Sequence, residues 1–202
     1  MRGLEERGLN VTLFHTGRHE VDEVAHVEHL HGDPFSAEGV AAALAGRSFD
    51  VVVACYGRLR TIAEVLSGRC DRFVSVGGTP AYRGYFDPTR FDPPGLPIPT
   101  AEDAPRSSED DDGKSYRVAR TEDLLFEYQP SAIHLRYPFV YGPRQIAPLD
   151  WCIVRRVLNH RPAIILPEGG LAAETRSFSE NAAHTVLRSE ERRVGKECRS
   201  RW

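Results

Sequence analysis

The sequence predicts an α/β fold built on a doubly wound parallel sheet, and two kinds of segment carry this prediction. Short, continuous apolar segments, typical of buried parallel strands, alternate with segments whose apolar residues recur at helical spacing. The clearest strand is 49–55, and 131–137 is another. Behind the second strand, Pro138, Gly142 and Pro143 exclude a regular continuation. Ligands of such sheets bind beyond the carboxyl ends of the strands, so we expect this loop to form a wall of a ligand site.

The other elements are expected to alternate along the chain. A first helix ends at Gly8, and Ser36 can cap a second helix that stops at Gly46. A long helix begins near Gly113 and ends before Pro130. Further helices are expected through Ile62 and Leu66, over 151–158 and from Asn181, and further strands over 11–15, 26–31, 72–76 and 163–167.

The composition is ordinary for a globular protein of 202 residues, with 41% hydrophobic and 27% charged residues. A formal net charge of −3 gives no reason to expect a nucleic-acid partner. No apolar run approaches the roughly 18 residues that span a bilayer, and the first residues lack the apolar core of a signal peptide. The cysteines (Cys55, Cys70, Cys152 and Cys198) form no Cys-x-x-Cys pair. We therefore expect a cytoplasmic protein with reduced thiols and no membrane partner.

The last fifteen residues, 188–202, carry six basic and three acidic side chains with almost no apolar pattern. One interpretation is a solvated basic tail. The peptide also resembles the translation of a common sequencing-library adapter, which would encode all of it in order. We therefore expect the natural sequence to end near Leu187 and 188–202 to be an artefact.

A motif covers the end of strand 131–137 and the loop after it, and it reads Leu135-Arg136-x-x-x-Val140-Tyr141-Gly142-Pro143-Arg144. Tyr116 precedes it by one helix, with the basic Arg120 four residues further on. Together with Tyr116 and Arg120, the motif resembles the NAD-dependent epimerase/dehydratase family, the extended short-chain dehydrogenases/reductases. The resemblance implies a partial NAD(P)-binding Rossmann-like domain over 1–148 and the start of a small substrate-binding lobe over 149–187.

The family's chemistry implies an NAD(P)-dependent epimerase/dehydratase or reductase that exchanges a hydride with a hydroxyl or carbonyl substrate, such as a nucleotide sugar. Tyr116 would be the general acid/base, and a hydroxyl of Thr79 or Ser75 would bind the substrate oxygen. Tyrosine titrates at about pH 10 unaided, so a fixed cation must stabilise its phenolate at neutral pH. Arg120 stands where the family has a compact lysine, and arginine is not its equivalent. A catalytically silent NAD(P)-binding or sensor protein and a non-functional fragment therefore stay open, as does a homodimer of the complete protein.

The family's cofactor contacts can be assigned residue by residue. Arg18 follows strand 11–15 where no acid stands, which favours NADP over NAD, although a plain loop arginine is an equal alternative. Asp33 would lie beside the adenine, or else it is a turn residue. The implied cofactor residues are Thr16, Gly17, Arg18, Asp33, Tyr56, Gly57, Tyr116, Arg120, Tyr137, Pro138 and Val140, and the implied substrate residues are Tyr82, Arg144 and Arg176.

Such a domain begins with a strand and a Gly-rich turn that brings backbone N–H groups to the cofactor's pyrophosphate. No Gly-x-Gly-x-x-Gly pattern precedes Leu4. We expect the first strand, which is the central one of the sheet, to be missing together with this turn.

No metal site is expected. On a strand, His29 and His31 would share a face that His26 does not, and no nearby carboxylate or cysteine completes a ligand set. The acidic run 109–112 lies in the proline-rich loop 85–112, and a solvated surface explains such a block better than a metal site does.

Overall fold

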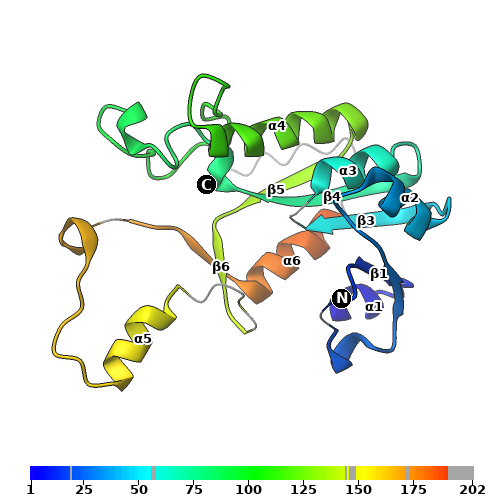
Figure 1. The fold of residues 1–202 in the computed structure, drawn as a ribbon, viewed down its shortest axis with the longest axis horizontal. Helices are drawn as coiled ribbons and strands as arrows, with labels where there is room; N and C mark the ends of the chain where they lie inside the picture. Colours follow the sequence, from blue (N-terminus) through cyan, green and yellow to red (C-terminus); the bar gives the residue numbers. More distant parts are fainter. Residues whose placement is uncertain (19, 56–57, 144, 146–148, 172, 191–202) are drawn as a thin grey trace.

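The computed structural model describes residues 1–190 except 19, 56–57, 144, 146–148 and 172. This part of the chain forms parallel strands with helices on both sides of them (Figure 1). The α/β class that the sequence predicts is confirmed. No helix within the described residues is long and apolar enough to cross a membrane.

The larger sheet has three parallel strands in the order β3-β4-β5. Strand β3 covers Phe49–Cys55, β4 covers Cys70–Gly78 and β5 covers Ile133–Tyr137. The middle strand, β4, has neighbours on both edges and helices on both faces, so Phe73 is only 2% exposed and Val74 is fully buried. This double burial explains the continuous apolar pattern of these strands.

A second sheet consists of β1 (Thr12–His15) and β2 (Glu28–His31), which pair in parallel with His15 opposite His31. The sequence predicts one doubly wound sheet, but no ladder joins β1 to β3 among the described strands. A doubly wound sheet has the strand order 3-2-1-4-5-6. If β1 and β2 are its second and third strands, the break falls where its first strand lies.

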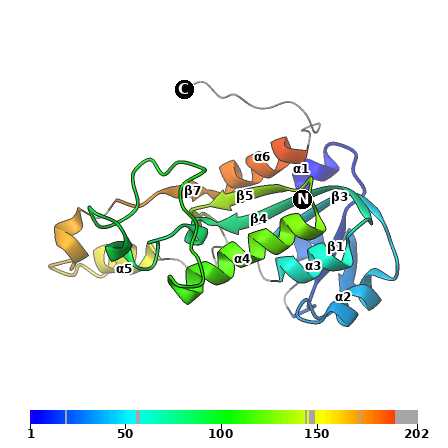
Figure 2. The ribbon, with the colours of Figure 1, turned by 90° about the horizontal axis from the view of Figure 1, so that it is seen from above.

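Helices cover both faces of the larger sheet (Figures 1 and 2). One face carries α2, α3 and α4, and the other carries α6, which packs on β4 and β5. The short α1 (Arg2–Glu5) lies beside the end of α6, where the Arg7 guanidinium donates to the Leu187 carbonyl at 2.7 Å. The bounds are Ala37–Leu44 for α2, Leu59–Val65 for α3, Gly113–Tyr128 for α4 and Ser179–Glu190 for α6.

One hydrophobic core connects these layers. Leu125 of α4 and Val40 of α2 are fully buried against Phe73. Phe14 of β1 and Leu30 of β2 pack against the same cluster, so both sheets share it. The two sheets are thus held together by apolar packing rather than by backbone hydrogen bonds.

Helix starts agree with the capping residues in the sequence. Ser36 accepts a hydrogen bond from the Gly39 N–H at 3.0 Å, and a left-handed Ala45 followed by Gly46 ends α2. Asp112 caps α4 by accepting from the N–H groups of Lys114 and Ser115, at 3.2 and 3.0 Å. This acid of the run 109–112 therefore starts a helix.

Beyond β5, the chain forms a smaller parallel pair, β6 (Phe139–Tyr141) and β7 (Arg176–Phe178). The expected irregular loop thus contains a short strand. Helix α5 (Trp151–Leu158) has the predicted bounds. The predicted strand 163–167 is wrong, because this segment has no ladder partner within the described residues and Ile165 is 87% exposed.

Four short 3-10 helices complete the described elements. They are η1 (Asp22–Val24), η2 (Thr79–Ala81), η3 (Pro88–Arg90) and η4 (Pro167–Gly170). At the carboxyl end, α6 continues past Leu187, and the buried Ser189 donates to the Thr185 carbonyl at 2.8 Å.

Candidate functional site

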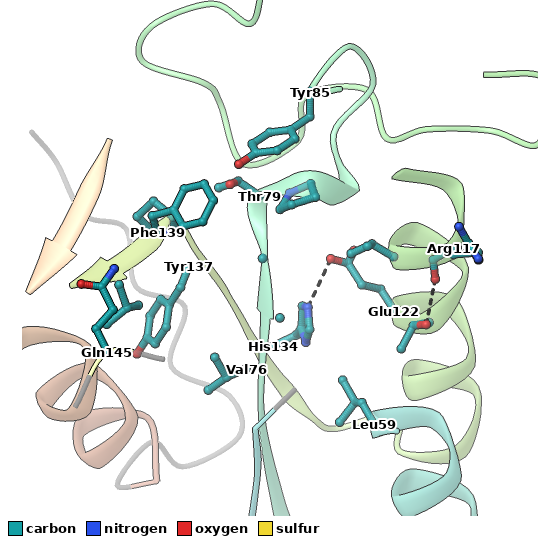
Figure 3. A pocket seen from close by; sticks show the side chains of 17 residues that line it. Leu59, Val76, Thr79, Tyr85, Arg117, Glu122, His134, Tyr137, Phe139 and Gln145 are labelled. Carbon is teal, nitrogen blue, oxygen red and sulfur yellow. Dashed lines mark hydrogen bonds and ion pairs between the residues drawn. The ribbon is translucent and has the colours of Figure 1, made fainter. Parts of the chain in front are cut away.

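A cavity of about 690 Å³ opens at the carboxyl ends of β4 and β5, beside α4 (Figure 3). This is where an open parallel sheet presents its ligand sites. Its volume lies within the range of small-molecule sites. The end of β4 and the turn η2 form one side through Gly77, Gly78, Thr79 and Pro80.

Two further walls face each other across this opening (Figure 3). Helix α4 provides Arg117, Val118, Thr121 and Glu122. The chain after β5 provides the opposite wall, and Tyr85 of the proline-rich loop lies over the end marked by Thr79. This opposite wall consists of Tyr137, Pro138, Phe139, Val140 and Gln145.

The most connected polar group of the cavity is the Glu122 carboxylate, whose side chain is 1% exposed. Arg136 donates to it from Nε at 2.9 Å and from a terminal nitrogen at 2.7 Å. Arg106 adds a contact at 3.3 Å, and Nε2 of His134 lies 3.2 Å from the carboxylate. A buried carboxylate needs such partners, because an unpaired buried charge is very costly.

These partners change the protonation of Glu122. Burial alone would raise its pKa, but the hydrogen bonds from His134 and Arg136 outweigh burial and lower the pKa of Glu122 to about 2. The hydrogen bond to Glu122 in turn raises the pKa of Arg136. Glu122 is therefore a fixed anion at neutral pH and an unsuitable general acid.

The network continues into β4 through His134. Its Nδ1 lies 2.7 Å from Oγ of Ser75, which is fully buried. A Cβ on Gly77 would lie 2.5 Å from Nε2 of His134, so the imidazole occupies the space that this glycine leaves open. Ser75, a predicted substrate-oxygen donor, is placed behind the cavity wall, with its hydroxyl engaged by His134.

Arg136 also joins the sheet to the proline-rich loop. It donates to the Tyr82 hydroxyl at 3.1 Å and to the Glu102 carbonyl at 3.0 Å. Tyr82 is 5% exposed and lies outside the lining, with the Arg136 guanidinium 5.0 Å from its ring centre. The structure thus assigns Tyr82 a place in this network, and its predicted contact with substrate stays a prediction.

Four of the predicted site residues line the cavity: Thr79, Tyr137, Pro138 and Val140. Tyr137 also donates from its hydroxyl to the Ala182 carbonyl of α6 at 2.5 Å. Their predicted roles in binding cofactor or substrate stay predictions.

Tyr116 and Arg120 are not among the described residues that line the cavity. Tyr116 is half-buried and Arg120 is exposed. Both lie on α4, but the positions that turn toward the opening are 117, 118, 121 and 122. The structure therefore does not bring the predicted acid/base pair together with Thr79.

The predicted adenosine end lies at the carboxyl ends of β1 and β2. Thr16, Gly17 and Arg18 are exposed, and the contact of Arg18 with a cofactor phosphate stays a prediction. Asp33 accepts a hydrogen bond from the Phe35 N–H at 2.9 Å, which is the turn alternative of the sequence analysis. Its contact with adenine stays a prediction.

The remaining predicted residues lie elsewhere. Arg176 donates to Asp150 at 2.8 Å and to Glu174 at 2.7 Å, so its charge is already paired with two carboxylates. Tyr56, Gly57 and Arg144 lie outside the described residues.

The sequence did not predict the hydrogen-bond network around Glu122. The signal was partly present, because Arg136 belongs to the quoted motif and a charged residue within a buried strand requires a partner. Its partner sits fourteen residues earlier on another element, and only the fold brings the two together.

Comparison with known proteins shows a shared fold. The sequence matches no protein-family model, and a search of curated proteins gives no match. Among solved structures, the Bordetella bronchiseptica enzyme WbmG in complex with NAD is similar, with a TM-score of 0.70 and 15% identity. The match covers 97% of this chain and 64% of WbmG, so the chain spans less than two thirds of that enzyme.

Two other NAD-bound structures give similar results. WbmH of the same organism, in complex with NAD+, has a TM-score of 0.69 and 18% identity over 93% of this chain and 65% of WbmH. MoeE5, in complex with UDP-glucuronic acid and NAD, has a TM-score of 0.67 and 17% identity over 95% of this chain and 67% of MoeE5. The chain thus has the Rossmann-like architecture of these proteins.

Proposed function

We propose that the complete protein is an NAD(P)-dependent epimerase/dehydratase or reductase whose substrate enters the cavity beside α4. The observation that carries this proposal is the position of the cavity at the carboxyl ends of β4 and β5, in a fold shared with NAD-bound enzymes. Its apolar walls with few polar groups suit a nicotinamide ring beside a small substrate. A bound nicotinamide would supply the hydride donor or acceptor.

The chain's own residues would position the substrate and move its proton. Thr79 would donate a hydrogen bond to the reacting oxygen from the mouth of the cavity. Tyr116 would exchange a proton with the substrate hydroxyl, and Arg120 would be the cation that stabilises its phenolate. Because neither side chain lines the cavity, both would have to reach it by side-chain rearrangement when a ligand binds. Arg18 would bind a 2′-phosphate, which favours NADP.

The substrate class follows from the same comparison. MoeE5 is described in complex with UDP-glucuronic acid, and we propose a hydroxyl-bearing substrate of nucleotide-sugar type here. We also place the protein in the cytoplasm, because its cysteines form no Cys-x-x-Cys pair. We further propose that the complete protein forms a homodimer, which a measurement of its molecular mass in solution would test.

A second candidate is a protein that binds NAD(P) without turnover. The position of Tyr116 and Arg120 outside the cavity lining favours it, because an acid/base group must reach the proton that it transfers.

The first experiment is thermal unfolding of the 202-residue chain with millimolar NADP or NAD. A ligand that binds only the folded chain raises the melting temperature. We expect a larger rise with NADP than with NAD. No rise with either would contradict cofactor binding by this chain.

A hydride-transfer assay then separates the two candidates. Candidate nucleotide sugars are added with the cofactor, and the absorbance of the reduced nicotinamide measures the transfer. If Tyr116 is the acid/base, Tyr116→Phe lowers turnover about 100-fold or more and leaves cofactor binding unchanged. Tyr128→Phe, on the same helix and packed against the core, is the matched control. Binding without turnover, with activity appearing in Arg120→Lys, would support the silent binding protein.

A further inference from the structure

Four potential metal ligands gather where β1 and β2 end, at a site separate from the cavity. They are His15 of β1, His29 and His31 of β2, and Glu20 in the chain after β1. One ligand atom of each lies within 4.8 Å of all the others. From the sequence, His29 and His31 lacked a completing ligand set, and the fold places His15 and Glu20 beside them.

Strand pairing explains how these residues meet. In the parallel ladder of β1 and β2, His15 is opposite His31 and Leu13 is opposite His29. Residues two apart on a strand point to one side, so His29 and His31 share a face with His15. The ring centres of His29 and His31 lie 4.9 and 4.8 Å from that of His15.

The hydrogen bonds of His29 leave one nitrogen directed into this cluster. Its Nε2 lies 2.9 Å from the Val24 carbonyl, which can only accept, so Nε2 carries the proton. Nδ1 therefore presents a lone pair, and it lies 2.7 Å from Nε2 of His15. A ligating imidazole that donates its other N–H to a backbone carbonyl is the usual support of a metal site.

Glu20 and His31 form the outer side of the cluster. Nε2 of His31 lies 2.9 Å from the Glu20 carboxylate, and the two side chains are about half exposed, at 50% and 52%. This side is open to solvent, so an ion can reach the three rings. The carboxylate supplies the negative charge that three neutral imidazoles lack.

We propose that His15, His29, His31 and Glu20 form a binding site for a late first-row divalent cation, with Zn²⁺ as the first choice. Three imidazole nitrogens and one carboxylate are ligands that zinc accepts in four-coordinate sites. Zinc bonds of about 2.0–2.2 Å place tetrahedral ligands roughly 3.4 Å apart, so side-chain shifts of about 1 Å close the set.

Each ring must present an unprotonated nitrogen to the ion, and His29 already does so through Nδ1. His31 would give up the contact of its Nε2 with the Glu20 carboxylate, and the proton on that nitrogen would move to Nδ1 or to solvent. To ligate through Nε2, His15 moves its proton to Nδ1 and gives up the contact in which the Gly17 N–H donates to Nδ1 at 3.1 Å. The ion then replaces the hydrogen bond between His15 and His29. It would tie β1, β2 and Glu20 together at the sheet edge, next to the segment of Gly17 and Arg18 that the proposed function assigns to the cofactor.

The test uses the full 202-residue chain with Zn²⁺ in titration calorimetry and Co²⁺ in visible absorption. We expect one ion per chain, a four-coordinate Co²⁺ spectrum without a thiolate charge-transfer band, and a melting temperature that rises with Zn²⁺. His31→Gln and Glu20→Gln change exposed side chains and are expected to leave the fold intact. Each should weaken binding at least 10-fold, an effect typical of lost metal contacts.

His26→Gln is the matched control, because His26 follows η1 but pairs with Glu5 at 2.6 Å and lies outside the cluster. It should bind as the unchanged chain does. The proposal is overturned if the unchanged chain binds no ion, if His31→Gln and Glu20→Gln bind equally well, or if a thiolate band shows that a cysteine holds the ion. If the unchanged chain binds the metal ion but neither NADP nor NAD, the result counts against the proposed function and not against the metal site.

Discussion

Glu122 illustrates how one residue ties the cavity to the stability of the fold. Its carboxylate is buried and hydrogen-bonded to His134 and Arg136 of β5 and to Arg106 of the proline-rich loop, while Arg136 extends the same network to the Glu102 carbonyl. A ligand in the cavity would therefore meet a wall whose charge is fixed in sign and position.

We expect Glu122→Gln to remove a pH-dependent part of stability. The folded pKa of about 2 lies below the ordinary 4.5, so the ionised form stabilises the fold fully above about pH 4.5, and this contribution disappears as the pH falls toward 2. By linkage the difference is on the order of 3 kcal/mol. In urea unfolding, the free energy of unfolding of Glu122→Gln should lie well below that of the unchanged chain at pH 7, and this difference should be smaller at pH 3.

The control for this prediction is Asp123→Asn. Asp123 pairs with Arg106 at 2.7 Å but is 40% exposed, so its loss should cost less than about 1 kcal/mol. A difference in the free energy of unfolding between the unchanged chain and Glu122→Gln that stays constant with pH would contradict the lowered pKa of Glu122.

Gly77 gives a second prediction at the residue scale. In Gly77→Ala the new Cβ would lie 2.5 Å from Nε2 of His134, and this ring is held by both Ser75 and Glu122. We expect a loss of about 1–3 kcal/mol in the free energy of unfolding, measured by urea denaturation. Gly113→Ala, where a Cβ meets nothing within 4 Å, should be neutral or slightly stabilising, and an equal loss there would refute the steric explanation.

At the scale of elements, the start of α4 depends on one carboxylate. Asp112→Ala removes the acceptor for two backbone N–H groups and should cost about 1 kcal/mol, by thermal or urea unfolding. Asp110→Ala changes an exposed neighbour and should alter stability by less than about 0.5 kcal/mol. Equal effects would mean that charge, rather than capping, determines the loss.

Elements with local signals were predicted from the sequence, and elements without them were not. Helix α4 has a capping acid at one end and a proline past the other, and β3 has a continuous apolar run. The segment 163–167 has an equally apolar run, but none of the described strands is placed to pair with it. The positions of Tyr116 and Arg120 also escaped the sequence, because a spacing of four fixes only their mutual face and not where that face points.

At the scale of the whole molecule, stability is expected to come from the core shared by the helices and both sheets. Leu125→Ala empties a fully buried position and should lower the free energy of unfolding by about 2–5 kcal/mol. The same substitution at Leu158 of α5, which is 62% exposed, should change it by less than about 0.5 kcal/mol. Urea midpoints measure both, and a large loss at Leu158 would mean that α5 is covered in solution.

The break between β1 and β3 has a consequence for the exchange of amide hydrogens with solvent. Successive N–H groups of a parallel strand point to opposite sides, so a strand with one neighbour uses only alternate amides in its ladder. In β1 and β3, slow and fast exchange should alternate residue by residue, whereas β4, paired on both edges, should exchange slowly throughout. A strand that came to lie between β1 and β3 would slow the fast half and give both strands the uniform protection of β4.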